Sequence, residues 1–175
     1  MKKKTLALVL ALTLLVAGGV GGTLAWLTDR TAEVKNTFTV GDINIGLTET
    51  TADYKMVPGN TIAKDPTVTV KANSEACWLF VKVTESTDLK DFITYAIAEG
   101  WTELEAGVYY REVPASAADQ TFSVLAGDAV TVKSDVTRTM LETAKTDAPT
   151  LTFKAYAIQK DHFATADAAW AEVSK

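Results

Sequence analysis

The side chains that most often carry out catalysis are few in this 175-residue sequence, and they follow no known catalytic spacing. There is one histidine, His162, and one cysteine, Cys77. A Ser-His-Asp triad needs a histidine beside a nucleophile, and no nucleophile motif surrounds His162. An H-E-x-x-H zinc site needs two histidines. Phosphate-binding and dinucleotide-binding glycine motifs and the C-x-x-C pair are absent as well. We therefore expect no catalytic residue, no metal ion and no cofactor, and we interpret the protein as not being an enzyme.

Carboxylates are the remaining candidates for chemistry. They are scattered along the chain, and the candidates considered are Asp42, Glu49, Asp53, Glu75, Glu85, Asp88, Asp91, Glu103 and Glu105. Two of them, brought together by folding, could serve as the acid and base of a glycosidase. Their spacing matches no calcium loop, and we interpret nearly all of them as solvated surface charges. A secreted hydrolase stays a third alternative, which would need a cleft with two close carboxylates and a raised pKa.

Aromatic side chains and the lone thiol each allow two interpretations. Exposed together, Trp78, Trp101, Tyr109, Tyr110 and Trp170 could form a platform on which a carbohydrate stacks. Aromatic residues in strands more often pack in the core. The cysteine at position 77 lies in an apolar, strand-like run, where it is expected to be a small core residue and not a thiol kept for a partner.

The charge of the chain limits its partners. The formal net charge is -5. Without Lys2, Lys3 and Lys4, 14 basic and 22 acidic residues remain. Because an acidic surface repels phosphate backbones, we expect no nucleic-acid partner. The length fits one domain with a core of its own.

The N-terminus has the layout of a secretory signal. The first 22 residues run from three lysines through an apolar stretch to a glycine-rich end. Thr23 and Ala25 then place small residues at the -3 and -1 positions of a signal-peptidase site, with cleavage before Trp26. The predicted organisation is a signal peptide over residues 1–25 and one domain over residues 26–175, secreted to the cell surface or matrix.

A membrane anchor is the alternative interpretation of the same segment. Residues 5–27 contain no charged side chain, so the stretch is long enough to span a bilayer. Its glycines oppose a stable helix, because each costs about 1 kcal/mol of helix propensity relative to alanine. We therefore expect contact with the membrane only through an uncleaved leader.

Alternation of apolar and polar residues predicts about eight short strands in the remaining chain. The predicted strands cover residues 38–40, 43–47, 67–71, 77–84, 92–97, 108–113, 120–125, 129–133 and 150–158, with a one-residue slip at Gly41-Asp42 between the first two. Residues 120–133 read as a hairpin, and the strand that starts at Cys77 is apolar on both faces, as in a central strand. Short helices are predicted over residues 137–145 and, capped by Thr165, over residues 166–173.

These elements predict a mainly β fold. Short strands with turns every 8–12 residues are typical of a β-sandwich or jelly roll. The expected fold is a single β-sandwich, jelly-roll-like domain with a short C-terminal helix, preceded by an N-terminal signal helix.

Several segments resemble the TasA/camelysin family of exported proteins, which a SipW-type signal peptidase processes. Residues 21–29 (GGTLAWLTD) and 36–43 (NTFTVGDI) resemble the leader and first strand of that family. Residues 57–60 (VPGN), 68–71 (VTVK) and 153–159 (FKAYAIQ) resemble its later segments. The resemblance implies a jelly-roll-like domain and a SipW-type signal peptidase as a partner.

The resemblance also implies a role in cell-surface or biofilm-matrix fibres, built from copies of the chain by donor-strand exchange. In that mechanism the freed N-terminus of one subunit pairs with the sheet of the next. The implied donor segment runs from Leu27 to Phe38 and includes Thr28, Val34 and Thr37. The metalloendopeptidase activity ascribed to some members is not implied here, because this chain has a single histidine.

Two functions therefore lead the sequence-based expectations. The first is a secreted structural protein, a fibre subunit that polymerises once its leader is removed. The alternative is a monomeric cell-surface binding module for glycan or protein, which would expose an aromatic patch.

Overall fold

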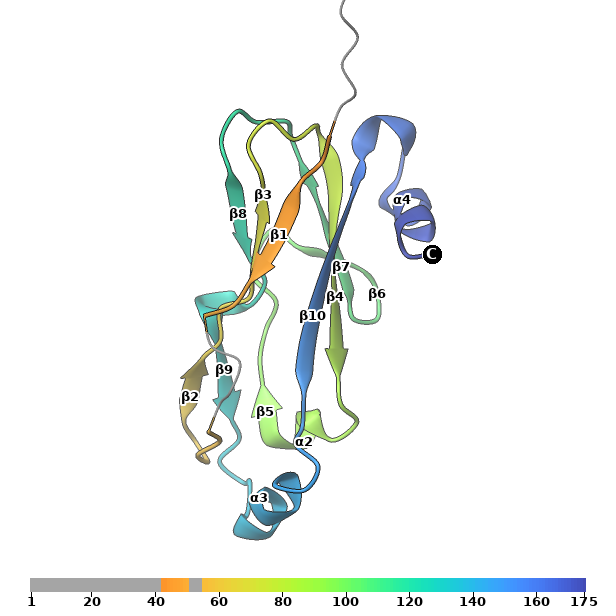
Figure 1. The fold of residues 1–175 in the computed structure, drawn as a ribbon. Coiled ribbons are helices and arrows are strands. Elements are labelled where there is room, and N and C mark those ends of the chain that lie inside the picture. The colour runs from red at the N-terminus through yellow and green to blue at the C-terminus, as the bar shows by residue number, and fades with distance from the viewer. Residues whose placement is uncertain (1–41, 51–54) are drawn as a thin grey trace, which may run out of the picture. The chain divides into compact units, whose positions relative to one another are not determined.

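Short strands make up most of the structure, a computed structural model that describes residues 42–50 and 55–175 (Figure 1). The strands are β1 (Ile45–Thr48), β2 (Thr61–Ala63), β3 (Thr67–Val70), β4 (Cys77–Glu85), β5 (Ile93–Thr94), β6 (Thr102–Glu105), β7 (Val108–Val113), β8 (Gln120–Ser123), β9 (Ala129–Val132) and β10 (Leu151–Gln159). The helices are α2 (Leu89–Phe92), α3 (Arg138–Ala144) and α4 (Ala166–Val173), with 3-10 turns η1 (Ala126–Asp128) and η2 (Lys160–His162). The predicted mainly β class and the short C-terminal helix are confirmed. The predicted signal helix and the slip at Gly41-Asp42 fall wholly or partly outside the described residues.

The strands form three antiparallel sheets. Their orders are β1-β3-β8, β2-β9-β5 and β10-β4-β7-β6. In the third sheet β4 pairs with β10 over nine residues, from Cys77 opposite Gln159 to Glu85 opposite Leu151. On its other side β4 pairs with β7. The position is central, as predicted, and both faces of β4 are covered, one by β3 and the other by α4.

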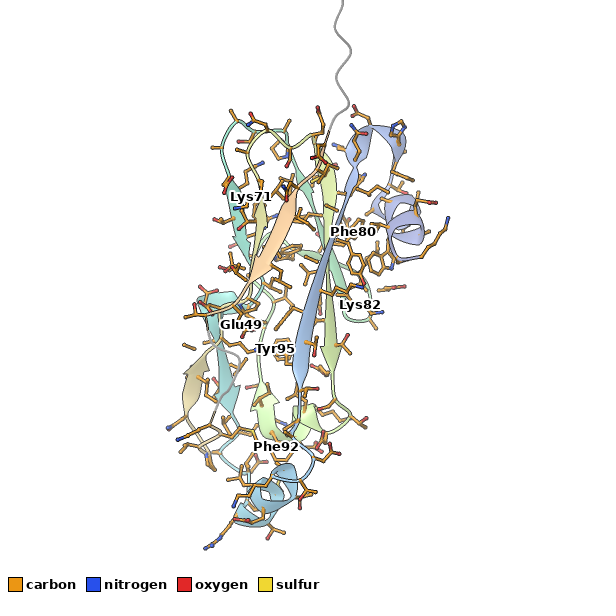
Figure 2. The ribbon with its side chains drawn as sticks, viewed as in Figure 1. Glu49, Lys71, Phe80, Lys82, Phe92 and Tyr95 are labelled. Carbon is orange, nitrogen blue, oxygen red and sulfur yellow. The ribbon has the colours of Figure 1, made fainter. Side chains whose placement is uncertain are left out.

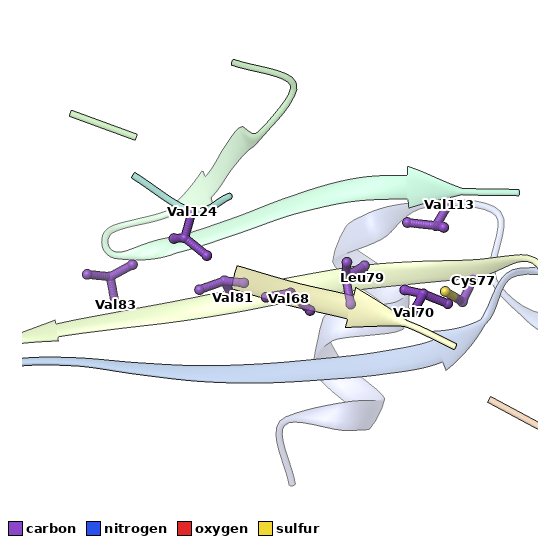
Figure 3. Close-up of a cluster of buried hydrophobic side chains, with 8 residues drawn as sticks. All are labelled: Val68, Val70, Cys77, Leu79, Val81, Val83, Val113 and Val124. Carbon is purple, nitrogen blue, oxygen red and sulfur yellow. The ribbon is translucent and has the colours of Figure 1, made fainter. Parts of the chain in front are cut away.

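The first hydrophobic cluster joins one face of β4 to β3. Leu79, Val81 and Val83 from β4 pack with Val68 and Val70 from β3 (Figure 3). Successive side chains of a strand point to opposite faces, so the odd-numbered residues of β4 reach this cluster together. Each fully buried Val or Leu side chain contributes on the order of 2 kcal/mol, which ties the faces of the two sheets together.

The opposite face of β4 packs against the C-terminal helix. Trp78 and Phe80 share a cluster with Ala166, Ala169 and Trp170 of α4, and Phe80 is labelled on that side in Figure 2. The predicted cap forms, since the Thr165 hydroxyl accepts a hydrogen bond from the Ala168 N–H at 3.3 Å. The small residues Ala166 and Ala169 let the helix approach the sheet closely.

A second cluster lies around the sheet that contains β9. It joins Phe92 of α2, Val132 of β9 and Ala144 of α3. The helix predicted over residues 137–145 forms as α3, and Thr137 caps it by accepting a hydrogen bond from the Met140 N–H at 3.3 Å. This cluster forms the floor of the groove described below.

The predicted hairpin over residues 120–133 is wrong. β8 pairs with β3, whereas β9 pairs with β2 and β5. The chain does not reverse between them, because η1 with Gly127 at φ +66° carries it onward. The Lys64 N–H donates to the Asp128 carbonyl at 2.7 Å, which keeps the chain alongside the strand that leads into β3. A glycine between two short strands indicates a turn without fixing its direction.

Candidate functional site

The residues predicted to take part in export and assembly lie outside the described residues. They are Thr23, Ala25 and Trp26 in the cleavage zone and Leu27, Thr28, Val34, Thr37 and Phe38 in the donor segment. A surface that takes up a strand from another chain needs an apolar floor and a strand edge with free backbone groups.

A groove of about 400 Å³ opens between β2 and β10. We call it the β2–β10 groove. Lys64, Ala148, Pro149, Thr150 and Thr152 line it together with six larger apolar side chains, which are Met56, Ile62, Leu89, Ile93, Val130 and Leu151. All six belong to, or pack against, the second hydrophobic cluster. The groove is therefore a place where the core is reached from the surface.

Sheet topology explains why the groove is open. β2 and β10 are each the outermost strand of their sheet among the described residues. The backbone N–H and C=O groups of β2 point alternately toward β9 and away from it. Asn60 and Lys64, on either side of β2, hydrogen-bond toward β9, so every second residue between them does the same. In an antiparallel ladder the residues between such positions point their backbone groups the other way. Thr61 and Ala63 thus present their N–H and C=O groups away from β9, on the side where a further strand can add.

A charged pair closes one end of the groove. Lys64 is only 7% exposed, and its ammonium lies 2.6 Å from a Glu49 carboxylate oxygen and 5.4 Å from the centre of the Phe153 ring. A buried ammonium is tolerated only with such a partner. The Asp65 carboxylate accepts hydrogen bonds from the N–H and hydroxyl of Thr50, and these bonds lower the pKa of Asp65. Both contacts tie the segment after β1 to the segment between β2 and β3.

The arrangement suits a strand with small apolar side chains. The lysine in the lining has its charge partner within the chain, and apart from Thr150 and Thr152 the other lining residues are apolar. Sequence reasoning missed this site, because Met56-Val57 and Ile62-Ala63 are apolar pairs too short to show a period. Between these pairs lies Pro58-Gly59-Asn60, which is a turn signal and carries no information about a binding site.

The five aromatic residues considered as a carbohydrate platform do not form one. Trp78 and Trp170 are 6% and 9% exposed and pack in the cluster under α4, with Tyr110 beside them. Trp101 instead lies 5.3 Å from the Arg111 guanidinium, and Tyr109 packs against the first cluster. The packing interpretation of these residues is the one that the structure supports.

Titratable residues in the described chain gather at no metal site. No group of three or more His, Cys, Asp or Glu residues in residues 42–50 and 55–175 could hold a metal ion. His162 is exposed in η2. Two of the scattered carboxylates, Glu85 and Glu103, do line the same hollow, which is taken up below. Among residues 42–50 and 55–175, no helix is long and apolar enough to cross a membrane.

Comparison with family models, curated proteins and solved structures gives no match to this chain.

Proposed function

We propose that this protein is an exported structural subunit of cell-surface or matrix fibres, which assembles by donor-strand exchange. The observation that carries the proposal is the apolar β2–β10 groove between two strand edges. The proposal includes cleavage by a SipW-type signal peptidase near Ala25 and Trp26, and membership of the TasA/camelysin family on the resemblances given above.

The proposal includes a jelly-roll-like sandwich as the fold, with the three sheets arranged in two layers. In this arrangement β1-β3-β8 and β2-β9-β5 together form one layer, because β2 leads into β3 and β8 leads into β9. The sheet β10-β4-β7-β6 forms the other layer. Packing of β3 against β4 in the first cluster supports it. The groove is then a gap between the edges of the two layers.

The donor segment has a pattern that fits the groove. Within Leu27 to Phe38, Ala32, Val34 and Phe38 share one parity and would enter the groove as alternate side chains of one strand, with the polar Asn36 between the last two and Arg30 lying before them on the same face. Charged Glu33 and Lys35 fall on the other parity and would face water. Backbone hydrogen bonds to the edge of β2 or β10 supply affinity, and the alternating side chains supply register.

Chain direction makes the assembly head-to-tail. The described chain begins beside Glu75, whose N–H donates to the Asp42 carbonyl at 3.1 Å. β1 then runs from Ile45, opposite Val70, toward the end of β3 that follows β2 (Figure 1). Ile62 precedes Val70 by eight residues, or roughly 25 Å at about 3.3 Å per strand residue. The donor thus enters the domain at the end away from the groove, and repetition of this unlike contact builds an open filament.

Cleavage acts as the switch in this scheme. While the leader holds the start of the donor segment at the membrane, Leu27 and its neighbours cannot enter the groove of another subunit. Removal of residues 1–25 frees them. Polymerisation is thereby confined to the outside of the cell.

Deletion of residues 27–36 tests the proposal. The deletion should abolish polymers and leave the circular dichroism and the cooperative unfolding of the domain unchanged, because the donor segment precedes the described strands. Polymers that persist after the deletion, in protein that remains folded, contradict donor-strand exchange.

The alternative function is a monomeric cell-surface binding module for glycan or protein. The hollow lined by Tyr95, Tyr109, Glu85 and Glu103 is the observation that favours it. A cleaved chain that stays monomeric at all concentrations and binds through this hollow supports the alternative.

A further inference from the structure

Two adjoining hollows lie beside the β6–β7 turn, with volumes of about 480 and 370 Å³. Both are lined by Glu85 at the end of β4, by Tyr95 after β5 and by Tyr109 of β7. Glu103 completes one hollow, and Lys90 and Lys133 line the other. We call these six residues the Tyr–Glu cleft.

Tyr95 and Tyr109 bring half-buried rings and hydroxyl groups to the cleft, and the Tyr109 hydroxyl makes no hydrogen bond with a described residue. The Tyr95 hydroxyl donates to a Glu85 carboxylate oxygen at 2.6 Å, which fixes both side chains; Tyr95 is labelled in Figure 2. Burial, the hydrogen bond to Glu85 and its negative charge all raise the pKa of Tyr95. Burial and then the charges of Glu103 and Glu85 raise the pKa of Tyr109. Both phenols therefore stay protonated at physiological pH.

The charges of the cleft balance, and four of its six polar side chains, those of Tyr109, Glu103, Lys90 and Lys133, have no hydrogen-bond or ion-pair partner among the described residues. The cleft contains two carboxylates and two ammonium groups, which makes its formal charge zero. The cleft thus holds free acceptors and free donors within one concave surface. A strongly charged ligand would meet like charge at one of its two halves.

A neutral, polyhydroxylated ligand fits this combination. Sugar hydroxyls donate to carboxylates and accept from ammonium and phenol groups, and the apolar C–H face of a sugar ring packs on an aromatic ring. Binding sites of this kind combine ring faces with a few convergent polar groups. We propose that the Tyr–Glu cleft binds a unit of a neutral polysaccharide. This binding is independent of donor-strand exchange and would attach the protein to a glycan matrix.

The test uses protein exported by cells that express the full chain, with three neutral probes: laminarihexaose, cellohexaose and chitohexaose. Saturation-transfer NMR and calorimetry measure binding. At least one probe should bind, and Glu103→Ala and Lys90→Ala, both at exposed positions, should each raise its Kd by about threefold to tenfold, as expected for loss of one or two hydrogen bonds.

Glu172→Ala on α4, at an exposed position that does not line the cleft, is the matched control and should leave the Kd unchanged. Failure of all three probes to bind at millimolar concentration overturns the proposal. So does binding that Glu103→Ala and Lys90→Ala weaken no more than the control does. Polymerisation should be the same in all three variants, so the outcome is separate from that of the fibre proposal.

Discussion

Burial defines what Cys77 can do. The residue is fully buried between its neighbours on β7 and β10, opposite Val113 and Gln159. Desolvation raises the pKa of its thiol to about 11, and only the thiolate is nucleophilic.

We predict that the thiol is inert in the folded protein. A disulfide reagent such as DTNB at pH 8 should label Cys77 only at the rate of unfolding, and labelling should become fast in urea. Rapid labelling of the native protein would contradict this and would point to a thiol available to a partner.

Two glycines have the same backbone conformation but different surroundings, so they distinguish backbone strain from steric crowding of a Cβ atom. Gly107 and Gly59 have φ +77° and +78°. A Cβ at Gly107 would lie 2.7 Å from the Val83 carbonyl oxygen, whereas a Cβ at Gly59 would have nothing within 4 Å. The Val83 N–H also donates to the Gly107 carbonyl at 2.7 Å, so the two backbones are held together.

We predict that Gly107→Ala destabilises the protein more than Gly59→Ala. Both variants lose about 1 kcal/mol from the left-handed conformation, and Gly107→Ala loses a further 1–3 kcal/mol or so from overpacking against Val83. Urea unfolding of the two variants measures the difference. Equal losses would show that the turn relaxes away from β4.

At the residue scale, the sequence predicted burial where a residue's own strand determines it. The apolar run around Cys77 was enough to place the thiol in the core, because both faces of that strand are covered. The fate of Trp78, Tyr110 and Trp170 depended on α4 lying over the sheet, and a sequence pattern cannot say which face of a sheet a distant helix covers.

At the element scale, α4 depends on one side chain. The ring of Trp170 lies 5.3 Å from the ring of Phe80 and 5.2 Å from that of Tyr156, and its indole N–H donates to Glu105 at 2.8 Å. An eight-residue helix is too short to be stable by itself in water, so its docking must come from these contacts.

We predict that Trp170→Ala lowers the free energy of unfolding by about 3 kcal/mol, as for other buried aromatic residues. Glu172→Ala, on the same helix but exposed, should change it by less than about 0.5 kcal/mol. Chemical denaturation is followed by far-UV circular dichroism, because this signal does not depend on the fluorescence of Trp170. Equal stability of the two variants would mean that α4 contributes nothing to the domain.

The predictability of elements followed their length and periodicity. β4, β7, β10 and α4 were predicted because each is long enough to show its period. β2 and β6 were not, because three or four residues with one partly buried side chain give no alternation to detect. The β2–β10 groove was unpredictable for the same reason, since it exists only where the short edge strand β2 faces β10.

At the scale of the whole molecule, the entry of the chain and the β2–β10 groove lie at opposite ends of β1, and this separation underlies the proposed filament. We predict that Ile62→Asp, which places a charge in the groove lining, prevents polymerisation of the cleaved protein. Val57→Asp should not, because Val57 is 49% exposed and does not line the groove. Sedimentation of both variants measures assembly, and circular dichroism checks folding. A folded Ile62→Asp variant that still polymerises would place the acceptor elsewhere.

The most direct test of the central proposal compares two forms of the chain that differ only at the N-terminus. One starts at Trp26 or Leu27, and the other carries a blocking extension before that residue. Size-exclusion chromatography and electron microscopy report their assembly. Donor-strand exchange predicts filaments from the free N-terminus and monomers from the blocked one. Monomers from both forms would contradict the structural role and favour a surface binding module.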